Sequence, residues 1–229
     1  RVKTLHPLIF GGILGRDSDK NQMEEHGIEN IDMVICNLYP FKSAAEKGVD
    51  LSSLIEEIDI GGPSLLRAAS KNHSRVSVVT DPGDYGWILS EILNGGLTFE
   101  QRQQLALKSF RHTAEYDSII QSVLAQRFGE EELPSSLHLT GIGSPPLRYG
   151  ENPHQSSVFY SDLLHSAPSV ANSEQLQGKQ LSYNNLLDFD AALAIVMEFD
   201  DPTAVIVKHN NPCGVASSET LLEAFSNAM

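Results

Sequence analysis

The segment "VIVKHNNPCG", residues 205–214, ends a run of apolar β-branched residues with a lysine and a histidine. Histidine titrates near neutral pH, and a neighbouring cation favours its neutral, proton-accepting form. Lysine can stabilise a negative charge that develops during a reaction. Lys208 and His209 therefore form a candidate acid–base pair at the end of a buried strand. A solvated strand end without a chemical role would explain the same residues.

A second candidate lies in "DIGGPSLLRAASKNH", residues 59–73, where Asp59 precedes a pair of glycines and a helical pattern. The start of a helix presents free N–H groups to an anion, and glycine lets a ligand come close to the backbone. Ser64, Arg67 and Lys71 are spaced to share one face of this helix. An amphipathic helix with a solvated polar face would explain the spacing, but it would not explain the glycine pair.

The segment "RVKTLHP" opens the chain and places two cations and a hydroxyl within four residues. Arg1, Lys3 and Thr4 suit the binding of a phosphate group. An exposed basic cluster without a ligand is the alternative.

The segment "CNLYPF", residues 36–41, directly follows an apolar run. Loops at the carboxyl ends of parallel strands are where α/β proteins place their ligands. Asn37 and Tyr39 could reach into such a crevice. A turn in which Tyr39 and Phe41 pack against the core is an equally good interpretation.

The composition excludes several classes of protein. The net charge of −14 argues against a nucleic-acid-binding surface, although a few basic residues in one cleft can still hold a small anion. Cys36 and Cys213 lie far apart, so they give neither a disulfide framework nor zinc spacing, and they favour a reducing compartment. The sequence contains no GxSxG motif, no P-loop and no GxGxxG in a strand–helix setting.

The apolar runs are too short for a transmembrane helix, and the beginning of the chain has no secretory signal pattern. The chain begins with Arg1 and ends in a helical pattern at Met229. We therefore expect it to be truncated at both ends.

The elements that must position these residues follow an alternating pattern. Apolar runs predict buried parallel strands at residues 32–36, 75–79 and 203–207. Helical patterns occupy residues 61–72, 82–93, 98–128 and 185–199. Such alternation is typical of an α/β layered fold. Because residues 129–147 are rich in Gly, Pro and Ser, we expect domains at 1–133 and 147–229 with a linker at 134–146.

Five segments in this order resemble one family. They are "RVKTLHP", "CNLYPF", "IDIGGPSLLRAASKNH", "LRYGENPHQ" and "VKHNNPCG". The chain is similar to the bifunctional purine-biosynthesis family, which joins an inosine monophosphate (IMP) cyclohydrolase to an aminoimidazole carboxamide ribonucleotide (AICAR) formyltransferase. The resemblance implies that residues 1–133 belong to a methylglyoxal-synthase-like cyclohydrolase domain. Residues 147–229 would begin a formyltransferase domain with a cytidine-deaminase-like α/β fold.

For the cyclohydrolase, the resemblance implies ring closure of formyl-AICAR to IMP with loss of water. Lys71 would transfer the proton. The residues that would contact the substrate are Arg1, Lys3, Thr4, Cys36, Asn37, Tyr39, Asp59 and Gly61.

For the formyltransferase, the resemblance implies transfer of a formyl group from 10-formyltetrahydrofolate, as co-substrate, to the amine of AICAR. His209 would remove the amine proton and Lys208 would stabilise the transition state. Arg148 and Tyr149 resemble nucleotide-phosphate contacts, and Asn185 resembles a ligand contact. Neither activity requires a metal or a redox cofactor.

The same resemblance implies a cytoplasmic homodimer that acts on small nucleotides and binds neither nucleic acid nor membranes. We expect residues 1–229 alone to be weakly active or inactive, because much of the second domain would be absent. Two other classes remain open. One is a non-catalytic purine-nucleotide-binding module on the same scaffold, which would not need Lys71, Lys208 or His209. The other is a purely structural or assembly domain.

Overall fold

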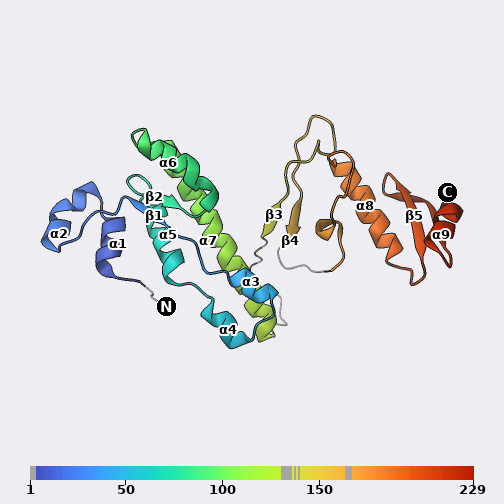
Figure 1. Cartoon of the computed structure of the whole chain (residues 1–229), viewed down its shortest axis with the longest axis horizontal. Coiled ribbons are helices and arrows are strands. Elements are labelled where there is room, and N and C mark those ends of the chain that lie inside the picture. Colours follow the sequence, from blue (N-terminus) through green and yellow to red (C-terminus); the bar gives the residue numbers. More distant parts are fainter. Residues whose placement is uncertain (1–3, 130–135, 137, 139, 163–166) are drawn as a thin grey trace. The chain divides into compact units, whose positions relative to one another are not determined.

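The computed structural model describes residues 4–129, 136, 138, 140–162 and 167–229 (Figure 1). The chain divides into two compact units, residues 1–138 and 139–229. This boundary falls inside the segment 134–146, for which the sequence predicts a linker. From Gly141 onward that segment already forms a strand of the second unit.

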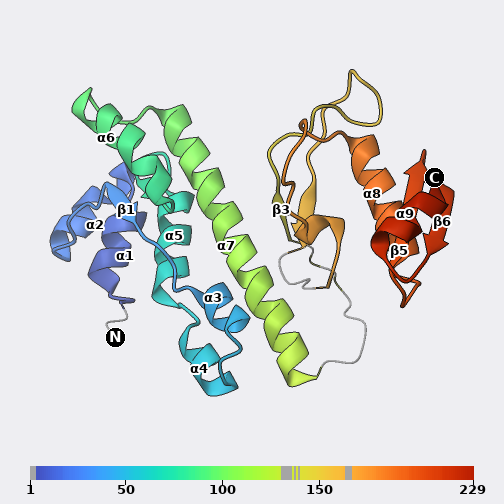
Figure 2. The ribbon, with the colours of Figure 1, turned by 45° about the vertical axis from the view of Figure 1, so that its right-hand side comes forward.

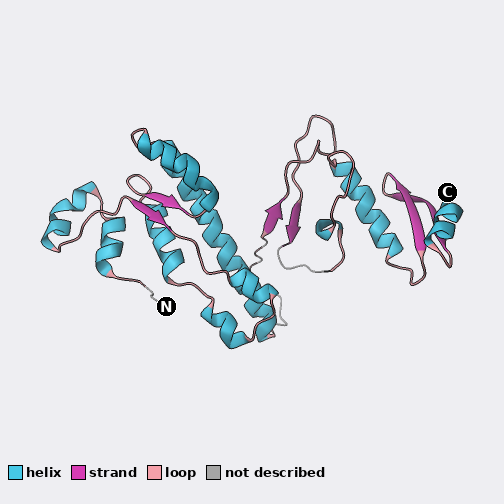
Figure 3. Ribbon diagram, viewed as in Figure 1, coloured by secondary structure: helices cyan, strands magenta, loops and turns pink. Residues whose placement is uncertain are grey.

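The first unit combines a short parallel sheet with helices (Figure 3). Its elements are α1 (Pro7–Leu14), the 3-10 helix η1 (Asp17–Asp19), α2 (Lys20–Glu25), β1 (Met33–Ile35), α3 (Phe41–Glu46), α4 (Leu51–Glu56), α5 (Gly61–Lys71), β2 (Ser77–Val79), the 3-10 helix η2 (Pro82–Asp84), α6 (Tyr85–Leu93) and α7 (Phe99–Phe128).

The parallel pair expected from the apolar runs at 32–36 and 75–79 is confirmed. β1 and β2 are parallel, with Met33 opposite Ser77 and Ile35 opposite Val79. Parallel neighbours need a long crossover connection, and here α3, α4 and α5 supply it. Both strands therefore end at the same edge of the sheet, where the 36–41 segment begins.

Helices α5 and α7 run side by side and cover the sheet (Figure 2). Their buried contacts with β2 include Leu66, Ala69, Val78 and Leu105. A capping box starts α7, in which Thr98 Oγ1 accepts the N–H of the third helical residue, Gln101, at 3.2 Å. Gly129 ends the helix at φ 73°, a left-handed conformation that favours glycine.

Helix α1 is held against the segment that follows α5. The Asn72 side-chain amide donates to the carbonyls of Ile13 and Gly15 at 2.8 and 3.0 Å. Arg75 donates to Gly15 at 3.1 Å and also to Gly12. These side chains satisfy carbonyl groups at the C-terminal end of α1, which have no partner within the helix.

The second unit contains two antiparallel strand pairs. Its elements are β3 (Gly141–Gly143), β4 (Tyr160–Asp162), the 3-10 helix η3 (Val170–Asn172), α8 (Tyr183–Val196), β5 (Thr203–Lys208), β6 (Asn211–Ser217) and α9 (Leu221–Ala228). β3 pairs with β4, and β5 pairs with β6.

The strand predicted at 203–207 exists as β5, but the prediction that it is parallel is wrong for the described part of the chain. Its neighbour there is β6, which runs antiparallel to it. The reason is the connection, since only His209 and Asn210 separate the two strands. A link this short makes a hairpin and cannot make a parallel crossover. The register shifts after Ile206, which leaves Cys213 as the extra residue of a bulge.

Candidate active site

In the first unit, several predicted site residues gather where β1 and β2 end. Cys36 follows β1, and its N–H donates to the Val79 carbonyl at 3.0 Å. The Asn37 side chain donates to the Thr80 carbonyl at 3.0 Å and accepts from the Tyr85 hydroxyl at 3.2 Å. The Asn37 amide is thus fixed across the ends of both strands, with one N–H still able to point toward a ligand.

The start of α5 forms the facing wall of this site. Asp59 Oδ1 accepts the N–H of Gly62 at 2.8 Å. A Cβ atom at Gly62 would lie 2.5 Å from Asp59 Oδ2 and 2.7 Å from a methyl group of Leu38. Glycine therefore favours this arrangement, because a methyl group here would displace the Asp59 carboxylate and the end of the Leu38 side chain.

The glycine pair also brings the beginning of the chain to this place. A Cβ atom at Gly61 would lie 3.2 Å from the Thr4 carbonyl oxygen. The absence of a side chain lets the two backbones approach. The Thr4 backbone therefore lies next to Gly61, two residues after Asp59.

Two polar groups in the first turn of α5 already have partners. The Gly62 N–H donates to Asp59, and Ser64 donates its hydroxyl proton back to the Ile60 carbonyl at 2.8 Å. The Asp59 carboxylate therefore lies where the helix end attracts negative charge. Anion binding at the start of α5 stays a prediction.

The pKa of the Cys36 thiol depends on its burial and on the nearby Asp59 carboxylate. Burial raises the pKa of the Cys36 thiol, and the negative charge of Asp59 raises it further. Cys36 is half-buried and the thiol remains protonated near neutral pH. It suits a packing or hydrogen-bonding contact and does not suit a nucleophile.

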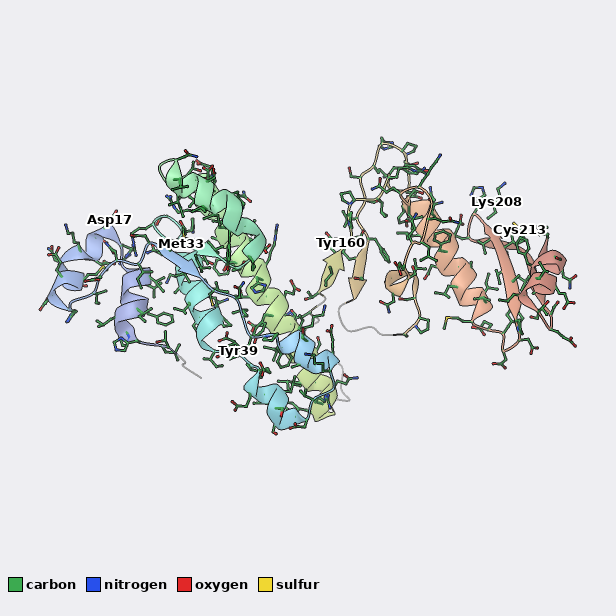
Figure 4. All side chains as sticks on the ribbon, viewed as in Figure 1. Asp17, Met33, Tyr39, Tyr160, Lys208 and Cys213 are labelled. Atoms are coloured by element: carbon green, nitrogen blue, oxygen red, sulfur yellow. The ribbon has the colours of Figure 1, made fainter. Side chains whose placement is uncertain are left out.

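A pocket of 270 Å³ lies between the 37–42 segment and α7. Asn37 and Tyr39 line it together with Lys42, His112 and Glu115. Its volume is slightly below the usual range for small-molecule sites. Tyr39 is partly buried on the segment that leads into α3 (Figure 4), whereas Phe41 is fully buried.

Lys71 lies at the other end of α5 from Asp59 and Gly61. It is exposed in the last turn of α5, whereas Gly61 begins that helix. At 1.5 Å per residue the two ends are about 15 Å apart along the axis. Arg67 is also exposed, and its guanidinium lies over the Phe110 ring at 5.9 Å. Arg1 and Lys3 lie outside the described residues.

In the second unit, the structure groups the predicted residues Arg148, Tyr149 and Asn185. Arg148 donates to the Tyr149 hydroxyl at 3.1 Å and lies over its ring at 4.9 Å. The Tyr149 carbonyl accepts the N–H of Tyr183 at 3.2 Å. The hydroxyl of Ser182 and the charge of Arg148 lower the pKa of Tyr149.

Asn185 also has a structural role at this position. It is the third residue of α8, and its side-chain oxygen accepts from the backbone N–H and the hydroxyl of Ser182 at 3.1 and 2.9 Å. This capping box fixes where α8 begins relative to Tyr149. The side-chain nitrogen is the group that Asn185 could offer to a ligand.

Lys208, labelled in Figure 4, ends β5, and His209 follows it in the turn to β6; both are exposed. His209 and Asn210 have φ angles of 52° and 60°, in the left-handed region. A two-residue turn with both φ angles positive usually contains glycine. Asp188 of α8 accepts the N–H of Asn210 at 2.8 Å and so supports this turn. Strained non-glycine residues of this kind are concentrated at functional sites.

Sequence reasoning missed the supporting residues Tyr85, Ser182 and Asp188, and also Tyr116, whose hydroxyl accepts the Asp59 N–H at 2.9 Å. Ser182 carries a local signal, because serine is a preferred residue immediately before a helical pattern. The other three contact residues that are distant in the sequence, and no local pattern identifies them.

The fold and these groups define an α/β chain that opens with a methylglyoxal-synthase (MGS)-like domain. The family model "MGS-like domain" matches residues 2–64. The family model "AICARFT/IMPCHase bienzyme" matches residues 69–229. The chain belongs to the AICARFT/IMPCHase bienzyme family.

Relatives from several bacteria match the whole chain. It is 52% identical to the bifunctional purine biosynthesis protein PurH of Persephonella marina, covering 46% of that protein. It is 50% identical to PurH of Bacillus subtilis, covering 45%. The chain thus spans about half the length of these relatives. A solved structure, "Crystal structure of ForH", is 37% identical over 54% of this chain and 66% of that one, with a TM-score of 0.48.

Two general features of the described residues bear on the class of site. None of their helices is long and apolar enough to cross a membrane. Nor do their His, Cys, Asp and Glu side chains gather in any group of three or more that could hold a metal ion.

Proposed function

We propose that the protein containing this chain carries out two consecutive steps of purine biosynthesis. The first is formyl transfer to AICAR, and the second is the cyclisation of formyl-AICAR to IMP. The observation that supports this most is the family match across residues 69–229 together with the grouping of Thr4, Asp59 and Gly61. Residues 1–133 would form the cyclohydrolase domain and residues 147–229 the beginning of the formyltransferase, joined by the linker 134–146.

In the cyclohydrolase, the carboxamide nitrogen attacks the formyl carbon, and the formyl oxygen leaves as water. The carboxamide nitrogen and the formamido nitrogen each lose one proton while the departing oxygen gains two, so the site must accept and donate protons and stabilise charge on oxygen. Asp59 and Gly61 would line the base, Tyr39 would lie beside the reacting group, and Lys71 would transfer the proton. Arg1, Lys3 and Thr4 would contact the phosphate and the substrate, and Cys36 and Asn37 would hold the nucleotide.

The position of Lys71, at the far end of α5 from Asp59, limits the role that it can have in the reaction. With Asp59 at the other end of α5, the two side chains must act on different parts of the substrate or its surroundings. Lys71→Ala should therefore lower cyclohydrolase turnover with little change in the affinity for IMP, whereas Asp59→Ala should lower turnover and weaken IMP binding as well.

In the formyltransferase, 10-formyltetrahydrofolate supplies the formyl group as co-substrate. His209 removes a proton from the attacking amine of AICAR, and Lys208 stabilises the negative charge on the formyl oxygen. Arg148 and Tyr149 hold the nucleotide phosphate, and Asn185 contacts the ligand through its amide. The left-handed turn supports this assignment, since it keeps both side chains of the pair at the hairpin tip.

We further propose that the complete protein is a cytoplasmic homodimer that needs no metal or redox cofactor and binds neither nucleic acid nor membranes. Light scattering tests the dimer. Retention of both activities after treatment with a chelator tests the absence of a metal.

The decisive experiment supplies the complete protein with AICAR and 10-formyltetrahydrofolate and follows formyl-AICAR and IMP by chromatography. His209→Ala should abolish formyl transfer but leave the cyclisation of added formyl-AICAR unchanged. His26→Ala, which changes another exposed histidine, in the first unit, should affect neither step. IMP binding without turnover by the unmodified protein would favour a non-catalytic nucleotide-binding module instead.

A further inference from the structure

Tyr116 of helix α7 connects two of the motifs around the first site, although it belongs to neither. It is only 8% exposed. Its ring packs edge-on against Phe41 of the 36–41 segment, with centroids 6.5 Å apart and an interplanar angle of 72°. Its hydroxyl accepts the N–H of Asp59 at 2.9 Å and donates to the Glu57 carbonyl at 3.1 Å.

We propose that Tyr116 is a positioning residue for Asp59, and that its hydroxyl holds the carboxylate in the place where the cyclohydrolase needs it. This inference rests on the proposed function of the first site. Asp59 is held at two points, by Tyr116 through its backbone N–H and by Gly62 through its carboxylate. Two fixed points leave the side chain little freedom to rotate away.

The hydroxyl matters here beyond the packing of the ring. Phenylalanine would pack against Phe41 equally well, and burying a phenol is favourable only when its O–H finds partners. Both partners belong to the loop before α5, 57 and 59 residues away along the sequence. Tyr116 therefore links the long helix to the Asp59 loop specifically.

The protonation state of Tyr116 is suited to this role. Burial raises the pKa of Tyr116 above its ordinary value. The phenol therefore keeps its proton at every pH at which the enzyme would work. It donates to Glu57 and accepts from Asp59 at the same time, which fixes the orientation of the hydroxyl.

The test uses Tyr116→Phe in the complete protein, with Val123→Ala as a control. Val123 is buried two turns further along the same helix, so its truncation lowers stability without touching the hydroxyl. We expect Tyr116→Phe to lower kcat for cyclisation of formyl-AICAR by about tenfold to a hundredfold. Val123→Ala should leave kcat within about twofold at a temperature where both variants are folded.

A double-mutant comparison separates positioning from general stability. In an Asp59→Asn background, Tyr116→Phe should have almost no further effect on kcat, because the carboxylate through which it acts is gone. Equal fold-losses in the two backgrounds would overturn the inference.

A measurement independent of activity completes the test. Hydrogen exchange of the peptide covering residues 57–62 should accelerate in Tyr116→Phe and remain unchanged in Val123→Ala. Unchanged exchange in Tyr116→Phe, or faster exchange with normal kcat, would each refute positioning. If the unmodified protein does not cyclise formyl-AICAR at all, the proposed function itself fails and the positioning role fails with it. Hydrogen exchange would still show whether Tyr116 holds the loop.

Discussion

Arg75 is the side chain whose removal should most weaken the first unit. Its side chain is only 18% exposed, and its guanidinium donates to the Asp32 carboxylate at 3.0 Å. It also donates to the backbone carbonyls of Gly12, Gly15 and Ile31. One cation therefore joins the end of α1, the entry to β1 and the entry to β2.

The substitution Arg75→Met keeps most of the apolar stem and removes every donor. A hydrogen bond from a charged group contributes about 1.5–3 kcal/mol, but the contributions within one network are not additive. Asn72 still donates to Gly15, and the Ile31 N–H still donates to Gly12, so these carbonyls keep a partner. We therefore expect a loss of about 3 kcal/mol in the free energy of unfolding, at the low end of what two such bonds give.

Urea unfolding followed by tryptophan fluorescence measures this loss in the first unit alone. Trp87 is the only tryptophan in the sequence, and it lies in α6. With a slope of about 2 kcal/mol per molar urea, the midpoint should fall by about 1.5 M. Arg16→Met is the matched control, because Arg16 also pairs with an aspartate, at 2.9 Å, but is 72% exposed. Similar midpoint shifts in the two variants would refute the argument that the hydrogen bonds from Arg75 to backbone carbonyls stabilise the first unit.

Three further predictions follow from features of single residues. Gly62→Ala should cut cyclohydrolase turnover at least about tenfold, because the new methyl displaces the neighbouring carboxylate, whereas Gly86→Ala, in open space on α6, should leave activity unchanged. Thr98→Ala should lower the free energy of unfolding by about 1 kcal/mol in the same urea assay, and an unchanged midpoint would contradict its capping role. At pH 8, iodoacetamide should alkylate exposed Cys213 about tenfold faster than Cys36, because the raised pKa of Cys36 keeps its thiol protonated until higher pH. Equal alkylation rates measured by mass spectrometry would refute this.

The longer helices and the parallel strand pair could be predicted from local sequence patterns. Helices α5, α7 and α8 have lengths of 11, 30 and 14 residues, and their apolar and polar positions repeat with the helical period. Helices α1 to α4 were missed because they are only 6 or 8 residues long, too short for a period to be visible. The pairing of β5 was missed because its turn lacks the glycine that usually marks a hairpin.

The candidate site was predictable as a set of residues and less so as an arrangement. Helical spacing correctly placed Lys71 on an exposed face of α5, and because Asp59 precedes this helix, the sequence also puts the two side chains at its opposite ends. Tyr116 was not predictable, because its contact with Asp59 spans 57 residues and depends on how α7 packs against the loop. Side chains that bind can carry a sequence motif, whereas side chains that hold them in place need only the right position in the fold.

The turn at His209 and Asn210 has a further consequence. Each non-glycine residue in the left-handed region costs on the order of 1–3 kcal/mol. That conformational cost is met when the hairpin forms, so a ligand that arrives later encounters an imidazole already in place. Glycine at position 209 would give a more stable hairpin, but it would remove the imidazole that the turn presents.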